Sequence, residues 1–144
     1  MLIKIKRYTF GKNVDKMSEK LSILLVEDNM LNQKVVTFSL KKLESNIMIA
    51  NNGLEGVELF KSNKFDFILM DIMMPIMDGL EATKKIREYE RENNIERTPI
   101  IAVTANTLDN DRDKCIQYGM DEFMSKPFSL PNLREILEEI GIHI

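Results

Sequence analysis

The feature that most constrains the fold is an alternation of short apolar runs with stretches of helical periodicity. Each run has the length of a strand, and the runs occupy residues 21–26, 46–50, 65–70, 99–104 and 122–125. Each run is followed by apolar residues that recur every three or four positions, as on one face of a helix. Apolar strands that each precede a helix are typical of a parallel sheet covered on both faces. The sequence therefore predicts a doubly wound five-stranded α/β domain with right-handed crossovers.

Local signals place several of the predicted helices. In the first helix the residues at helical spacing are Leu31, Val35, Phe38, Leu40 and Leu43. The helix after Asp78-Gly79 is expected to end near Asn93-Asn94. A helix from Asn106 to Tyr118 is expected to end at Gly119, because glycine is common just past a helix C-terminus. The last helix is expected at 129–140, after Pro127.

Length and composition favour one domain with one proper core. The chain has 144 residues, of which 44% are hydrophobic and 30% are charged, as in ordinary globular proteins. No apolar run approaches the ~20 residues needed to span a bilayer, so we expect no membrane insertion. The single cysteine, Cys115, can form no internal disulfide, and nothing in the sequence indicates export. We therefore expect a cytoplasmic location.

The charge is divided unevenly along the chain. The net charge is −3, but residues 1–20 hold six basic and two acidic groups, about +4, which leaves about −7 for residues 21–144. We therefore separate a basic N-terminal extension or linker, 1–20, from a domain at 21–144. An edge strand, a linker and a disordered tail remain alternatives for the extension. An acidic domain lacks the positive face used in sequence-independent nucleic-acid binding, so no direct nucleic-acid partner is expected.

Polar residues gather where the predicted strands end. In parallel sheets of this type, ligands bind beyond the carboxyl ends of the strands. The residues at those ends are Glu27, Asp28, Asp71, Thr104 and Lys126. Each alone has an ordinary structural interpretation, such as a helix cap for Asp28. Together they indicate one shared site.

The carboxylates of this site would require positive charge. Two carboxylates ~4 Å apart repel by about 4 kcal/mol at an effective dielectric near 20. Lys126 supplies one positive charge, and carboxylate oxygens suit Mg²⁺ better than zinc as a further source. The only histidine, His143, lies near the C-terminus and cannot anchor a zinc cluster. Beside Mg²⁺ and a lysine, Asp71 could act as a nucleophile and accept a phosphoryl group.

Several spaced motifs then carry a resemblance. Residues 21 to about 142 resemble the receiver domain of two-component response regulators in the stretches "ILLVEDNMLNQ", "FDFILMDIMMPIMDGLEATKKIR", "TPIIAVTAN" and "GMDEFMSKPF". The forms "VEDNMLNQ", "AVTAN" and "GMDEFMSKP" are similar to receivers attached to hybrid histidine kinases. The resemblance implies a flavodoxin-like (βα)5 fold with strand order 2-1-3-4-5. It also implies a phosphorelay role with an external histidine kinase or histidine phosphotransfer protein as the donor.

The resemblance further implies a role for each matched residue. The Mg²⁺ ligands would be Glu27, Asp28, Asp71 and the backbone carbonyl of Met73. Asp71 would be the phosphoacceptor, Lys126 would contact the phosphoryl group, and the Lys126-Pro127 bond would be cis. Thr104 and Phe123 would form the switch that shifts the 106–140 face, through which the family commonly dimerises. Such a domain catalyses only its own phosphorylation and dephosphorylation.

Two other functions remain open at this point. A receiver could act as a constitutive scaffold that retains its pocket without using it. A phosphohydrolase with an Asp nucleophile would share the topology, but it would need a second Asp where this chain has Met73. The motifs do not identify the cognate kinase or the downstream target. They are equally consistent with a stand-alone receiver and with a piece of a hybrid kinase.

Overall fold

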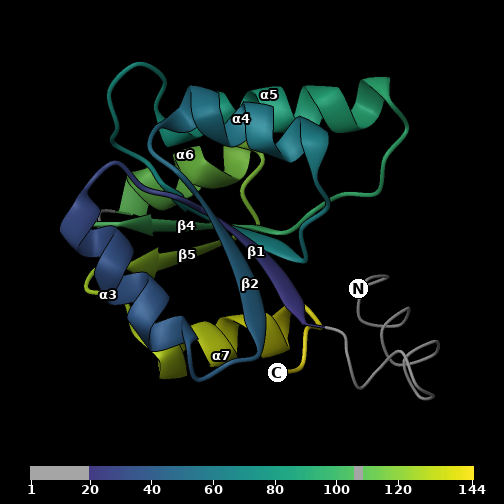
Figure 1. Ribbon diagram of the computed structural model, residues 1–144. Coiled ribbons are helices and arrows are strands. Elements are labelled where there is room, and N and C mark those ends of the chain that lie inside the picture. Colours follow the sequence, from purple (N-terminus) through teal and green to yellow (C-terminus); the bar gives the residue numbers. More distant parts are fainter. Residues whose placement is uncertain (1–19, 106–108) are drawn as a thin grey trace, which may run out of the picture.

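A five-stranded parallel sheet forms the centre of the domain (Figure 1). The computed structural model describes residues 20–105 and 109–144, so segment 1–19 and the predicted helix start at Asn106 lie outside the described residues. The strands are β1 (Leu21–Val26), β2 (Ser45–Ala50), β3 (Phe67–Asp71), β4 (Ile100–Thr104) and β5 (Glu122–Ser125). Their order is β2-β1-β3-β4-β5, which confirms the predicted fold class and strand order. β3 begins at Phe67 and not at residue 65, where the apolar run starts.

Helices cover both faces of this sheet. They are α3 (Met30–Leu40), α4 (Gly53–Ser62), α5 (Gly79–Glu92), α6 (Asp109–Tyr118) and α7 (Leu130–Glu139). In Figure 1, α4, α5 and α6 lie above the sheet, and α3 and α7 lie below it. Each layer of helices packs on its own set of buried side chains. Alternate residues of β1, β3 and β4 point to opposite faces of the sheet, so these strands contribute to both sets. This two-sided burial explains why the central strands are apolar at successive positions.

Polar side chains fix the starts of four helices. The caps are Asn29 for α3, Asn52 for α4, Asp78 for α5 and Ser129 for α7, each accepting a hydrogen bond from the backbone N–H three residues on. Such caps satisfy N–H groups that the helix itself leaves without a partner. Past α6, Gly119 has φ +111°, as expected for a glycine that ends a helix. All four caps lie between the carboxyl end of a strand and the helix that follows it, so they also fix the loops at the edge of the sheet that holds the predicted site.

α3 turns several of its apolar side chains toward solvent along its length. Of the five residues whose spacing predicted this helix, Leu40 and Leu43 are buried, whereas Leu31 and Phe38 are 69% and 71% exposed. Gln33 is buried in their place. Its Nε2 donates to the Glu27 carbonyl at 2.6 Å and to Asn51 Oδ1 at 2.8 Å. The predicted helix is confirmed. The contacts of Gln33 determine which side of the helix faces the sheet at the end near the predicted site.

β2 departs from the expectation of strands that are apolar throughout. It lies at one edge of the sheet, and its side chains alternate between exposed and half-buried until Ala50. Met48 on this strand is 38% exposed. An edge strand is less completely covered than a central strand. Apolar residues at alternate positions are therefore enough to pack its covered face.

A buried ion network joins α5 to the amino ends of β4 and β5. Arg87 on α5 is 5% exposed. Its guanidinium donates to four acceptors at 2.8–2.9 Å, which are the Gly119 carbonyl, Glu90 Oε1, the Thr98 carbonyl and Asp121 Oδ2. Burial lowers the pKa of Arg87, and the charges of Glu90 and Asp121 oppose that change. The network therefore pairs each buried charge with an opposite one.

Within the described ranges, none of the helices has both the length and the apolar content that crossing a membrane would require.

Candidate functional site

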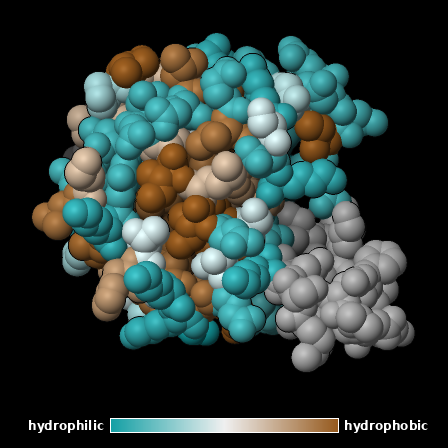
Figure 2. Space-filling model, viewed as in Figure 1, coloured by the Kyte–Doolittle hydropathy of each residue, from teal (hydrophilic) through white to brown (hydrophobic). Residues whose placement is uncertain are grey.

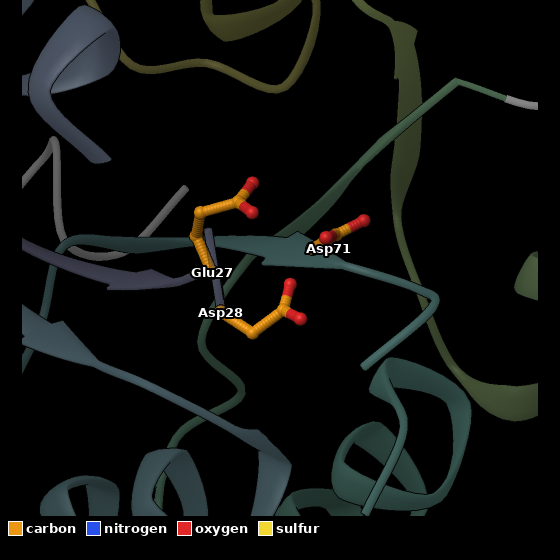
Figure 3. Close-up of side chains that lie close together, drawn as sticks. All are labelled: Glu27, Asp28 and Asp71. Atoms are coloured by element: carbon orange, nitrogen blue, oxygen red, sulfur yellow. The ribbon is translucent and has the colours of Figure 1, made fainter. Parts of the chain in front are cut away.

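Three carboxylates converge at the carboxyl ends of β1 and β3 (Figure 3). Glu27 and Asp28 follow β1, and Asp71 is the last residue of β3. Because Val26 and Met70 are partners in the parallel register, Glu27 and Asp71 leave neighbouring strands at the same level. One oxygen from each carboxylate lies within 4.8 Å of the others. Glu27 and Asp71 are buried and Asp28 is exposed, so the cluster opens to solvent on one side.

Lys126 brings a positive charge to the two buried carboxylates. Its Nζ lies 3.1 Å from Glu27 Oε1 and 3.4 Å from Asp71 Oδ2. Lys126 directly follows β5, and its backbone N–H donates to the Thr104 carbonyl at 2.8 Å. This bond ties the ends of β4 and β5 together beside the carboxylates. The adjoining Lys126-Pro127 bond is cis, as the resemblance implied.

Two α3 side chains support Glu27, and their roles were not predicted from the sequence. Glu27 Oε2 accepts from the Asn29 N–H at 3.0 Å and from Asn32 Nδ2 at 3.4 Å. Gln33 donates to the Glu27 backbone carbonyl. The sequence signal for these roles is the pair of amide side chains, Asn32 and Gln33, in the first turn of the helix that follows the two acids. These contacts hold Glu27 in place within the cluster.

Electrostatics leave the site short of positive charge. The pKa of Asp71 is raised from 3.8 to about 6, because the effects of burial and of the Glu27 charge together exceed the opposing effect of Lys126. Burial alone would lower the pKa of Lys126, but its hydrogen bond to Glu27 and the charges of Asp71 and Glu27 raise it overall. A deficit of this kind favours the binding of a cation. The donors are all hard oxygens, which fit Mg²⁺.

The described residues that carry the predicted chemistry line one cavity of about 510 Å³. Its lining comprises Glu27, Asp28, Asn29, Asn32, Asp71, Met73, Thr104, Ala105 and Lys126. Thr104 is buried, and the Met73 side chain is 73% exposed at the cavity edge. The structure thus brings together every predicted site residue except Phe123. Phe123 is half-buried and packs against the core beneath α4, α5 and α6.

The loop between β3 and α5 is held close to Asp71 by backbone contacts. The Gly79 N–H donates to the Ile72 carbonyl at 2.7 Å, and the Gly53 N–H donates to the Met77 carbonyl at 2.9 Å. A Cβ on Gly79 would lie 2.1 Å from the Asp71 carbonyl oxygen, and one on Gly53 would lie 2.4 Å from the Met77 oxygen. Both positions therefore require glycine, because no other residue lacks a Cβ.

Known proteins are similar to this chain in sequence and in fold. Histidine kinase 5 from Arabidopsis thaliana is 40% identical over 147 residues, covering 86% of this chain and 16% of its own length. The receiver domain of the sensor histidine kinase PA1611 from Pseudomonas aeruginosa, solved with a magnesium ion in its active-site cleft, is 40% identical with a TM-score of 0.74. That match covers 84% of this chain and 97% of the solved chain.

A further solved structure contains a receiver bound to its partner. It is the receiver domain of Ssk1 from Saccharomyces cerevisiae in complex with the histidine phosphotransfer protein Ypd1. The match is 32% identical with a TM-score of 0.77, and covers 83% of this chain and 88% of the solved chain. Residues 23–138 match the response regulator receiver domain family. The chain therefore belongs to this family and is a receiver domain of the kind found in phosphorelay signalling proteins.

Proposed function

We propose that Asp71 accepts a phosphoryl group from a phosphohistidine on a separate histidine kinase or histidine phosphotransfer protein. The observation that carries this proposal is the position of Asp71 at the end of a buried strand, with its carboxylate 3.4 Å from Lys126 Nζ and beside two further acids. A buried strand holds the nucleophile rigidly, and the cavity leaves it open to a donor. The complex of the Ssk1 receiver with Ypd1 supports a phosphotransfer protein as partner.

The transfer itself requires little of the protein beyond positioning and charge. An ionised Asp71 oxygen attacks phosphorus, the bond from phosphorus to the histidine nitrogen breaks, and that nitrogen keeps the electron pair. The product is an acyl phosphate on Asp71. Lys126 stabilises negative charge on the transferring oxygens, because its ammonium already lies at hydrogen-bonding distance from the acceptor carboxylate. The domain thereby catalyses only its own phosphorylation and dephosphorylation.

The donor set would hold Mg²⁺ through Glu27, Asp28, Asp71 and the backbone carbonyl of Met73. When bound, the ion would neutralise charge on the phosphoryl oxygens and the carboxylates. Magnesium in the cleft of the PA1611 receiver supports this assignment. Within this chain, Glu27 is held by Asn29, Asn32 and Lys126, so this acid is set in place before an ion arrives, and Asp28 is exposed to an ion that approaches from solvent.

Phosphorylation would be transmitted through Thr104 and Phe123. Thr104 lines the same cavity as Asp71, so its hydroxyl could turn toward the phosphoryl oxygens. Phe123 is half-buried one strand further along, which leaves its ring room to change position. The 106–140 face is then the surface that changes and the one through which a homodimer would form. A cytoplasmic location stays a prediction from the sequence.

Intact-mass measurement tests the assignment of Asp71. The protein is incubated with acetyl phosphate, with and without Mg²⁺, as wild type, Asp71→Asn and Asp113→Asn. Asp113 is an exposed acid on α6 and serves as the matched control. We expect wild type and the control to gain one phosphoryl group only with Mg²⁺, and Asp71→Asn to gain none. Normal labelling of Asp71→Asn would disprove the assignment, and no labelling of wild type would favour a scaffold with a silent pocket.

A further inference from the structure

The outer edge of β2 presents backbone groups that pair with no further strand of the described chain. β2 lies at the end of the strand order and bonds only to β1. The carbonyls of Glu44, just before β2, and of Ala50, at its end, accept from the β1 side at 3.0 Å. Because successive residues of a strand turn their backbone groups to opposite sides, those of Ser45, Ile47 and Ile49 point away from β1. These groups can receive a further strand.

β2 lacks the features that usually protect an edge strand from pairing. Its sequence, Ser-Asn-Ile-Met-Ile-Ala, has no charged residue and no proline, and it pairs with β1 residue by residue. Natural edge strands are commonly short, charged or interrupted. The other edge of this sheet follows that rule, because β5 has four residues, begins with Glu122 and is followed by Lys126 and Pro127. Of the two edges, β2 is therefore the one that is open to pairing.

The surface along this edge is apolar. Figure 1 views the domain from the β2 side of the sheet, and Figure 2, in the same view, shows hydrophobic surface in the middle of this face. On β2 itself, Met48 is 38% exposed, and Ile47 and Ile49 are half-buried. A partner strand would cover these apolar side chains and satisfy the outward backbone groups at the same time.

We propose that the β2 edge pairs with the β2 edge of a second copy of this chain, antiparallel and related by a two-fold axis. Such pairing places Ile47 opposite the same residue of the second copy, and it brings the start of each β2 beside the end of the other. Lys41, Lys42 and Glu44 are exposed before β2, and Glu55 lies in the first turn of α4 after it. A net positive start therefore meets a negative end in both halves of the pair.

This pairing would join two sheets into one and leave the predicted chemistry accessible. The lining of the Asp71 cavity includes no residue of β2. β2 is also at the opposite edge of the sheet from β5, which belongs to the 106–140 face. One short strand from each copy covers much less than the roughly 800 Å² per partner of a stable interface, so we expect association only in the high micromolar range.

Hydrogen exchange of individual amides tests the pairing on the full chain. Exchange and sedimentation are measured at low micromolar and at near-millimolar concentration for wild type, Met48→Lys, Ser45→Pro and the control Ile95→Lys. Ile95 is 40% exposed in the loop after α5, and so matches Met48 in exposure. In wild type we expect the amides of Ser45, Ile47 and Ile49 to gain protection as concentration rises, together with the mass of a dimer.

The variants separate pairing along β2 from other contacts. Met48→Lys should weaken association about tenfold, because it places like charges near each other across the paired strands. Ser45→Pro removes an outward N–H and leaves the bonds to β1 intact, so it should also weaken association. Ile95→Lys adds the same charge elsewhere and should associate as wild type does. Thermal unfolding of each variant at low concentration checks that it is folded.

Three results would overturn the proposal. Amides of Ser45, Ile47 and Ile49 that stay unprotected at near-millimolar concentration would show that a second copy does not cover the edge. Protection that is the same at every concentration would assign the edge to the extension 1–19 instead. A dimer that forms without this protection, or that Ile95→Lys weakens as much as Met48→Lys does, would place the contact on another face.

Discussion

The ammonium of Lys126 lies 3.4 Å from the Asp71 carboxylate, although the two residues are 55 positions apart in the chain. The contact exists because β3 and β5 are parallel and both end at the same edge of the sheet, with β4 between them. Lys126 also reaches Glu27 after β1. One lysine thus links the ends of three strands, and the charge balance of the site depends on the complete fold.

The raised pKa of Asp71 predicts a pH-dependent gain in stability for Asp71→Asn. Because the folded pKa is about 6 and the ordinary value is 3.8, the folded state binds this proton more tightly than the unfolded state. Ionised Asp71 therefore destabilises the metal-free fold above about pH 6, and this effect fades as pH falls toward 4. We expect Asp71→Asn to exceed wild type by about 1–3 kcal/mol at pH 7.5 in EDTA. Urea unfolding at several pH values measures the difference.

Asp113→Asn is the control for this experiment, since Asp113 is exposed on α6 and lies outside the site. Its free energy of unfolding should follow that of wild type across the pH range. If Asp71→Asn matched wild type at pH 7.5 in EDTA, ionised Asp71 would not be unfavourable in the fold.

Loss of Lys126 is predicted to make the fold dependent on magnesium. In Lys126→Gln the buried carboxylates of Glu27 and Asp71 would lose their shared cation. Breaking a buried pair by removing one partner typically costs about 3 kcal/mol or more, and added Mg²⁺ should recover part of that loss. The control is Lys85→Gln, which removes an exposed pair with Glu81 and should change stability by less than about 0.5 kcal/mol. A Lys126→Gln protein whose stability is the same in EDTA and in Mg²⁺ would contradict this prediction.

Arg87 is predicted to be essential for stability and dispensable for phosphorylation. Arg87→Met would leave Glu90 and Asp121 without their buried partner, at a cost of about 3–5 kcal/mol. Arg97 also binds Asp121 but its side chain is 54% exposed, so Arg97→Met should cost less than about 1 kcal/mol. Urea unfolding compares the two. Folded Arg87→Met should still accept phosphate from acetyl phosphate, because the network lies at the opposite end of the sheet from Asp71. If both substitutions lowered the free energy of unfolding equally, the burial of Arg87 would not add to its contribution to stability.

The sheet topology was predictable because burial on two faces leaves a clear pattern. The central strands must be apolar at successive positions, and parallel strands place the polar residues that follow them at one edge. Glu27, Asp71 and Lys126 are therefore predictable as neighbours from the positions at which the apolar runs end.

Features that depend on contacts between distant segments were not predictable. Spacing predicted the helix α3, but the buried side was decided by Gln33 bonding to Glu27 and Asn51. Arg87 has the sequence context of an exposed helical arginine, and its partners Thr98 and Asp121 come from other elements. The motif around Ile76 indicated a turn, yet not that an isoleucine would take the left-handed conformation, with φ +71°. In each case a hydrogen bond between segments overrides the local preference.

The close approach of Gly53 to the Met77 carbonyl limits which substitutions the first turn of α4 can accept. Gly53 has no charge and contributes nothing to the chemistry of Asp71, yet a single added methyl group would push against the backbone of the loop beside Asp71, the proposed phosphoacceptor. Mutational tolerance at residue 53 should therefore resemble that of an active-site position. A screen for lost signalling should return variants there that fold, carry every catalytic group and still fail to transmit.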